Sequence, residues 1–112
     1  MKTKLGAQRL LFPLPTVLIV TGNMEKANIM TLAWISILSG KPPTIGVSIG
    51  TRGISSFLIQ ENKDFSVNIV SAMNMIEADF CGITSGEDTD KFKETGLTKY
   101  PASKIKSPLI QE

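Results

Sequence analysis

Residues 27–38 read ANIMTLAWISIL, a mostly apolar run in the first half of the chain. Interpreted as a strand, the run predicts one long central strand, partly buried on both faces. Alternation divides it between two faces, one with Asn28, Met30, Leu32, Trp34 and Ser36, the other with Ile29, Thr31, Ala33, Ile35 and Ile37. Buried polar groups need partners. Packing alone does not explain the polar side chains of Asn28, Thr31 and Ser36, and a polar ligand is one way to supply those partners.

Two further strands are predicted on either side of this run. Residues 17–21, VLIVT, form a β-rich apolar stretch that the turn signal Gly22-Asn23 closes. Residues 44–50, TIGVSIG, alternate between one face with Ile45, Val47 and Ile49 and another with Gly46, Ser48 and Gly50. A face of only glycine and serine lets something approach the backbone closely. Either a tightly packed neighbouring helix or strand, or a ligand, could lie against this face.

Residues 51–62, TRGISSFLIQEN, predict a short amphipathic helix with Ile54, Phe57 and Leu58 on its apolar face and Asn62 as its C-terminal cap. Thr51, Arg52, Gly53, Ser55 and Ser56 crowd the start of this helix. Free backbone N–H groups, the helix dipole and an arginine together suit an anion such as phosphate. Ordinary N-capping by a serine or threonine is the more common reason for such residues.

The second half of the chain predicts alternating short elements. Residues 64–70, DFSVNIV, indicate a strand, and residues 72–81 a helix with Met73, Ile76 and Phe80 on one face. Residues 85–96, SGEDTDKFKETG, predict a loop and a short helix that Gly96 ends, and residues 108–110 hint at a last strand. The acidic residues between positions 77 and 90 fit a solvated surface better than a metal site, because their spacing matches no calcium loop.

Composition excludes several kinds of chemistry. The 112 residues, 42% of them hydrophobic and 20% charged, predict one domain spanning residues 1–112. The chain has no histidine, which excludes a Ser-His-Asp triad and histidine-ligated metals. Its one cysteine, Cys81, is predicted to be a buried and inert thiol. An enzyme built from this sequence would therefore need a bound cofactor to supply its reactivity.

The net charge and the hydropathy of the chain argue against nucleic acid and membranes as partners. A net charge of +2 is too weak for a nucleic-acid footprint, so no nucleic-acid partner is expected. No apolar stretch of about 18 residues is present, so no membrane span is expected either. The basic start is broken by Pro13 and Pro15 and lacks a small-residue cleavage site. It is not interpreted as a signal peptide, and a cytoplasmic location is expected.

The order of these motifs resembles the flavin reductase-like, or flavoredoxin-type, FMN-binding split β-barrel family. The resemblance runs from residue 5 to residue 112 and rests on LLFPLPTVLIVTG, NIMTLAWIS, PPTIGVSIG, DFSVNIV and ADFCGITSGEDTDKFKETGL in that order. No single motif is diagnostic. The pair NIMT-x-A-W and S-G-x-D-x-D-K-F is the most specific part.

The resemblance implies a mainly β fold with short helices, a six-stranded antiparallel barrel, and a homodimer with FMN at or near its interface. Residues 28–36 would run along the isoalloxazine ring. The implied contacts are Asn28, Met30, Thr31, Ala33, Trp34 and Ser36 for the ring segment, and Ser48, Thr51, Arg52, Ser55 and Ser56 for the ribityl chain and phosphate. Asn68 is a weaker candidate.

Two departures from the family pattern bear on these expectations. Family members often carry an arginine nearer the position of Gly53 and an aromatic residue near Ile54. Either Arg52 takes over the phosphate contact, or phosphate binding is weaker here. Family domains also continue well past the position of Glu112. The later strands that close the barrel and contribute to the dimer are therefore expected to be missing from these 112 residues. An open barrel would expose strand edges.

The implied function is that of an FMN-dependent oxidoreductase, either an NAD(P)H:flavin reductase or a flavoredoxin-like electron carrier. NADH or NADPH would be the electron donor, the flavin would carry the hydride chemistry, and a redox protein is a further candidate partner. The alternative is a non-catalytic FMN-binding module that serves mainly to dimerise. A purely structural barrel, with no flavin affinity, is a third possibility.

Overall fold

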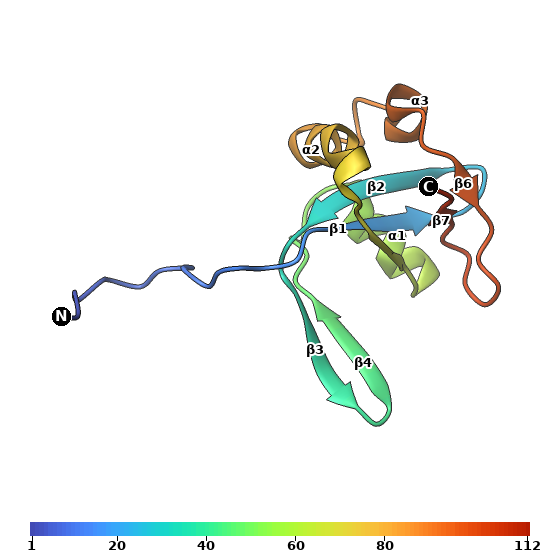
Figure 1. Ribbon diagram of the computed structural model, residues 1–112. Helices are drawn as coiled ribbons and strands as arrows, with labels where there is room; N and C mark the ends of the chain where they lie inside the picture. Colours follow the sequence, from blue (N-terminus) through green and yellow to red (C-terminus); the bar gives the residue numbers. More distant parts are fainter.

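The computed structural model describes residues 1–112 as a small sheet with helices on both sides and two projecting segments (Figure 1). The elements in chain order are β1 (Val17–Gly22), β2 (Ala27–Leu32), β3 (Ile35–Gly40), β4 (Pro43–Val47), α1 (Ile54–Asn62), β5 (Ser66–Ile69), the 3-10 helix η1 (Ala72–Asn74), α2 (Met75–Ile83), α3 (Lys91–Thr95), β6 (Lys99–Tyr100) and β7 (Leu109–Ile110). Residues 1–16 contain no helix or strand and extend away from the sheet. This confirms the predicted mainly β fold with short helices.

The central sheet has the order β2-β1-β5, and both pairings are antiparallel. All six residues of β1 are buried, because strands cover both of its edges and side chains cover both of its faces. The predicted turn after β1 is confirmed. Gly22 has a φ of 108°, and a Cβ there would lie 2.2 Å from the carbonyl oxygen of Lys26, so only glycine fits. The side-chain oxygen of Asn23 accepts hydrogen bonds from the backbone N–H groups of Glu25 and Lys26.

The prediction of one continuous strand over residues 27–38 is wrong. β2 ends at Leu32, which pairs with Val17, the first residue of β1. Beyond Leu32 the chain has no neighbour in the sheet, so it turns through residues 33–34 and starts β3, which pairs with β4 instead. The β3–β4 hairpin projects away from the sheet (Figure 1). The predicted faces hold within β2 and stop at this break.

The two faces of the sheet carry separate hydrophobic clusters. One face packs against α2 and α3 through the buried side chains of Leu18, Val20, Ile29, Ala78, Cys81, Phe92 and Leu97. The other face, toward α1 and the base of the hairpin, contains Val17, Ile19 and Leu32. The predicted burial of Cys81 is confirmed. Burial raises the pKa of the Cys81 thiol, so it stays protonated and unreactive at neutral pH.

Lys91 is buried within the first of these clusters, with 4% of its surface exposed. Its Nζ donates hydrogen bonds to the carbonyl oxygens of Ile29 in β2, at 2.9 Å, and of Cys81 in α2, at 2.8 Å. No carboxylate pairs with it, and burial lowers the pKa of its ammonium group. Lys91 therefore connects α3, where it is the first residue, to both β2 and α2.

The helix predictions need two corrections. In α2 the buried residues are Ala78 and Cys81. Of the predicted inner face only Phe80 packs against the first cluster, whereas Ile76 in α2 and Met73 in η1 are 81% and 91% exposed. In α1 the buried residue is Ser55, and Phe57 is exposed. The C-terminal cap of α1 is Lys63, in a left-handed conformation, rather than Asn62. The side chain of Asn62 instead donates a hydrogen bond to the carbonyl of Gly22.

The last part of the chain follows its prediction. Asp90 caps α3 by accepting a hydrogen bond from the backbone N–H of Lys93, and Gly96 ends the helix. β7 coincides with the predicted last strand and pairs with β6. The sheet, the hairpin and the β6–β7 pair remain three separate sheets and do not join into a closed barrel. None of the helices has the length and apolar character needed to cross a membrane.

Candidate functional site

Two segments that the sequence assigned to ligand binding form the walls of one cavity. Residues 30–34, at the end of β2 and in the link to β3, lie opposite residues 48–50, which follow β4. The backbone N–H of Ser48 donates a hydrogen bond to the carbonyl of Trp34 at 2.9 Å, which fixes the two segments together. The space between them, here called the strand cavity, has a volume of about 220 Å³.

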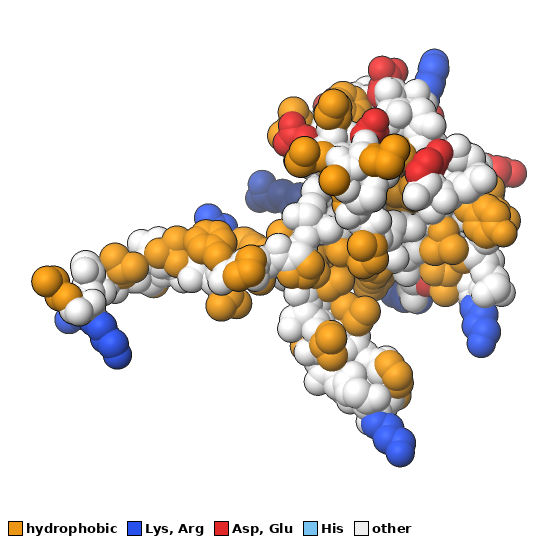
Figure 2. Space-filling model, in the orientation of Figure 1, with side chains coloured by type: hydrophobic (Ala, Val, Ile, Leu, Met, Phe, Trp, Pro, Cys, Tyr) orange, Lys and Arg blue, Asp and Glu red, His pale blue; other side chains and the backbone are white.

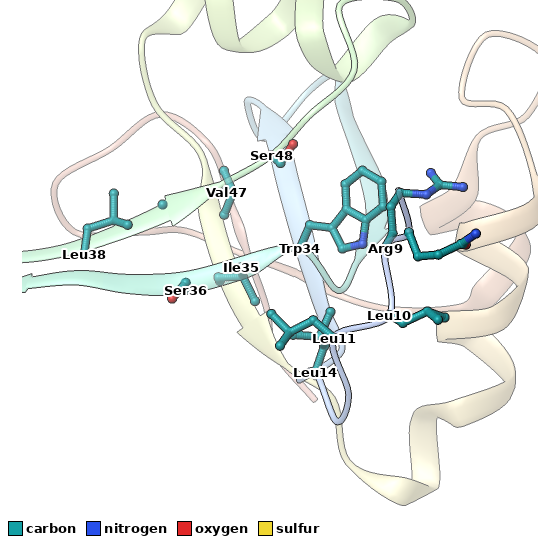
Figure 3. A pocket seen from close by; sticks show the side chains of 12 residues that line it. Arg9, Leu10, Leu11, Leu14, Trp34, Ile35, Ser36, Leu38, Val47 and Ser48 are labelled. Atoms are coloured by element: carbon teal, nitrogen blue, oxygen red, sulfur yellow. The ribbon is translucent and has the colours of Figure 1, made fainter. Parts of the chain in front are cut away.

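A larger cavity adjoins the first and shares Trp34 and Ser48 with it. It lies between the N-terminal segment and the base of the β3–β4 hairpin, has a volume of about 660 Å³, and is here called the tail cavity. Its lining residues are Gln8, Arg9, Leu10, Leu11, Leu14, Trp34, Ile35, Ser36, Leu38, Gly46, Val47 and Ser48. Figure 3 shows Trp34 between Ser48 and Arg9, with Leu11 and Leu14 beside Ile35.

Arg9 is a lining residue that sequence reasoning missed. Its guanidinium carbon lies 5.4 Å from the centre of the Trp34 ring, a cation–π contact between the N-terminal segment and the start of the hairpin. Nothing in the sequence links position 9 to position 34, because the intervening chain has to fold back before the two meet. No local motif could have revealed this contact.

The start of α1 lies close along the chain to the strand cavity. Gly50 lines that cavity, and α1 begins four residues later. The N-terminal cap is Gly53, with φ 95° and ψ 167°, and no side chain caps the helix. Capping by serine or threonine, the more common reason for such a sequence, therefore does not apply here. The first backbone N–H groups of α1 are left without a side-chain acceptor, and Arg52 beside them is exposed and forms no salt bridge.

The remaining predicted site residues divide into groups. Met30, Thr31, Ala33, Trp34 and Ser48 meet at the strand cavity, and Ser36 lines the tail cavity. The hydroxyl of Thr31 donates to the carbonyl of Ala78, so it holds α2 on the sheet.

Asn28 and Ser55 are both buried, and the Asn28 amide donates a hydrogen bond of 2.9 Å to the Ser55 hydroxyl. Their polar groups satisfy each other. Thr51, Arg52 and Ser56 lie at the start of α1 and line neither cavity.

The glycine and serine face of residues 44–50 has two explanations, at different positions. A Cβ on Gly46 would lie 2.7 Å from the side chain of Leu38, so Gly46 accommodates its neighbour across the hairpin. A Cβ on Gly50 would meet nothing within 4 Å, and Gly50 lines the strand cavity. The packing interpretation therefore applies to Gly46, whereas Gly50 remains available for the ligand interpretation.

Comparison with known proteins places the chain in a family. Residues 8–112 match the flavin reductase like domain. The chain belongs to the flavin reductase-like family. A flavoredoxin of Desulfovibrio vulgaris has a similar structure, with 37% identity and a TM-score of 0.92 over 100% of this chain and 62% of that one.

Further proteins are similar to this chain in structure or in sequence. A flavoredoxin from Methanosarcina acetivorans is 31% identical, with a TM-score of 0.83 over 99% of this chain and 60% of that one. An uncharacterized protein of Pyrococcus abyssi is 33% identical over 93% of this chain and 59% of its own length. The chain thus spans about three fifths of the length of the relatives it matches.

The lining of the two cavities is mostly apolar and carries few ionisable groups. Among the residues lining the two cavities, Arg9 is the only one with a titratable side chain. No carboxylate, thiol or tyrosine faces either cavity to act as a general acid or base.

Proposed function

We propose that this chain is one domain of an FMN-binding oxidoreductase. The observation that carries the proposal is that residues 30–34 and residues 48–50 line one cavity. The chain then leads from this cavity directly to the start of α1, which has no side-chain cap. A mostly apolar cavity followed along the chain by a helix start without a side-chain cap suits a molecule with an apolar ring at one end and a phosphate at the other.

The residues present fit this cofactor. The strand cavity, at about 220 Å³, would hold only part of such a molecule, since a typical small-molecule site has roughly 300–1,000 Å³, and the rest would lie along the start of α1. Met30, Ala33 and Trp34 would contact the ring system, and Arg52 with the first N–H groups of α1 would bind the phosphate. The hydroxyls of Ser48, Thr51 and Ser56 would contact the ribityl chain and the phosphate.

Bound FMN would supply the electron and hydride chemistry that no side chain here offers. The protein's own part is to hold the ring between apolar walls, exclude water from one side of it, and neutralise the phosphate. NADH or NADPH is the proposed electron donor. A flavoredoxin-like exchange with a redox protein is the proposed alternative to free flavin reduction.

We also propose that the chain acts as a homodimer. The N-terminal segment and the β3–β4 hairpin carry large exposed apolar side chains along most of their length (Figure 2). Phe12 and Ile37, which do not line the tail cavity, are 77% and 80% exposed. Monomeric proteins rarely leave patches of this kind uncovered, and a second copy offers the complementary surface.

The experiment that tests the proposed function is an absorption spectrum of the purified protein, followed by titration with FMN. A flavin band that stays with the protein through gel filtration is expected, followed by oxidation of NADH or NADPH. Flavin binding without any turnover of either nucleotide would support the non-catalytic module. No affinity for FMN would overturn the proposal for this chain.

A further inference from the structure

The tail cavity combines an apolar wall with one uncompensated positive charge. Of its lining residues only Arg9 is charged, and no acidic side chain lines the cavity. Arg9 makes no hydrogen bond and no salt bridge within the chain, and its only close partner is the ring of Trp34. All the N–H donors of its guanidinium are therefore available to a ligand.

The chemical character of the lining residues restricts which ligands the tail cavity can bind. Leu11, Ile35 and Val47 form apolar walls next to the indole of Trp34, which is half exposed (Figure 3). Such a surface favours an aromatic ring in the ligand, because a ring buries a large apolar area while few of its rotatable bonds have to be ordered. A guanidinium beside it favours a carboxylate, which it can bind with two parallel hydrogen bonds.

We propose that the tail cavity binds a planar aromatic carboxylate, with the carboxylate paired to Arg9 and the ring against Trp34 and the apolar walls. The ligand's role as a substrate rests on the proposed flavin function. Because the two cavities share Trp34 and Ser48, a ligand in the tail cavity lies next to a ring held in the strand cavity. Binding of the carboxylate itself does not require the flavin.

Benzoate and benzamide test the proposal, because they have nearly the same size and differ in charge. Trp34 is the only tryptophan of the chain, so its fluorescence reports on the cavity directly. Each compound is titrated into the full chain before and after addition of FMN, with calorimetry as a second readout. Benzoate is expected to bind about tenfold more tightly than benzamide, on the scale of one charge-assisted hydrogen bond.

Variants assign the effect to Arg9. Arg9→Gln is expected to lower the affinity for benzoate about tenfold, to the level of benzamide, and to leave benzamide binding unchanged. Arg9 is exposed on a segment without secondary structure, so this change removes no core contact. Lys4→Gln removes a charge from the same segment outside the cavity and is expected to have no effect.

The outcomes separate this proposal from the proposed function. Equal affinities for benzoate and benzamide, or a loss as large in Lys4→Gln as in Arg9→Gln, would overturn it. Benzoate binding that depends on Arg9 in a chain that never binds FMN would support the cavity and reject the flavin function. FMN binding without benzoate binding would reject the cavity alone.

Discussion

At the scale of single residues, the buried pair of Asn28 and Ser55 limits which groups remain for an anion. Their hydrogen bond ties β2 to the first turn of α1 and uses the Ser55 hydroxyl. Arg52 is the one cation adjacent to the uncapped helix start, and it is exposed and free of salt bridges. The phosphate contact proposed for this turn therefore depends mainly on Arg52 and on backbone N–H groups.

Replacing Arg52 by alanine is expected to weaken FMN binding by about tenfold or more, because a charge-assisted hydrogen bond to the phosphate is lost. Riboflavin, which has no phosphate, should bind as well as before. Titration of both ligands by flavin fluorescence measures the difference. Lys93→Ala, which removes an exposed charge from α3, serves as the control. An equal loss for FMN and riboflavin would show that Arg52 does not bind the phosphate.

Asp64 makes the stability depend on pH. Burial by itself raises the pKa of this carboxyl group, but hydrogen bonds from the Ser107 side chain and from the backbone N–H groups of Lys106 and Ser107 outweigh it, so the pKa lies below its ordinary value of 3.8. The folded state then binds the proton less readily than the unfolded state. The stabilisation is complete above the ordinary value and is lost as the pH falls through the lower, folded value.

Asp64→Asn should therefore lower the melting temperature at neutral pH and flatten its fall below about pH 4. Thermal unfolding followed by circular dichroism across this range measures both effects. Glu61→Gln, which alters an exposed acid on α1 without a bonded partner, is the matched control. Parallel pH profiles for Asp64→Asn and the wild-type protein would contradict the role of this hydrogen-bonded carboxylate.

At the scale of elements, the sequence predicted which segments form strands and helices better than where they end. The alternation of residues 27–38 contains no signal of the break at residues 33–34, because that break depends on the length of the neighbouring strand β1. The same limit applies to α2. Apolar side chains occur on more than one side of this helix, so periodicity could not decide whether Ile76 or Cys81 faces the sheet.

The candidate site was predictable where it depends on local pattern. Alternation and the glycine and serine face identified the walls of the strand cavity, and the Thr-Arg-Gly turn identified the start of α1. Arg9 was not predictable, because its contact with Trp34 joins segments that only the tertiary fold brings together. The pairing of Asn28 with Ser55 escaped prediction for the same reason.

Gly53 sets the direction in which α1 begins. Its φ of 95° and ψ of 167° lie in a region that only glycine occupies readily. Gly53→Ala is expected to cost about 1–3 kcal/mol in the free energy of unfolding, measured by urea denaturation, and to weaken FMN more than riboflavin. Gly40→Ala, at a glycine with open space and no positive φ, should change neither. An unchanged stability of Gly53→Ala would indicate that the helix start adapts without strain.

At the scale of the whole molecule, the two projecting segments dominate the shape. The radius of gyration is 15.3 Å, compared with about 13 Å for a compact chain of this length. Only 18 of the 112 residues are buried, so much of the apolar sequence faces outward. A second copy that covers the N-terminal segment and the hairpin would reduce this exposure.

The combined substitution of Phe12 and Ile37 by serine is expected to shift the proposed dimer toward monomer, because both side chains are largely exposed on the projecting segments. Sedimentation velocity across a range of protein concentrations measures the shift. Met73→Ser removes an equally exposed apolar side chain from η1, outside these segments, and should leave the sedimentation unchanged. A wild-type protein that sediments as a monomer at all concentrations would reject the proposed dimer.

The hydrogen bonds of Lys91 have a consequence for how the molecule opens. Since one buried ammonium group joins β2, α2 and α3, none of the three can separate from the others without breaking a hydrogen bond of Lys91 and leaving buried polar groups without that partner. Deuterium should therefore enter the protected amides of these elements in a single cooperative event, at one common free energy of opening. The β3–β4 hairpin is held mainly by its own ladder and should exchange earlier and independently.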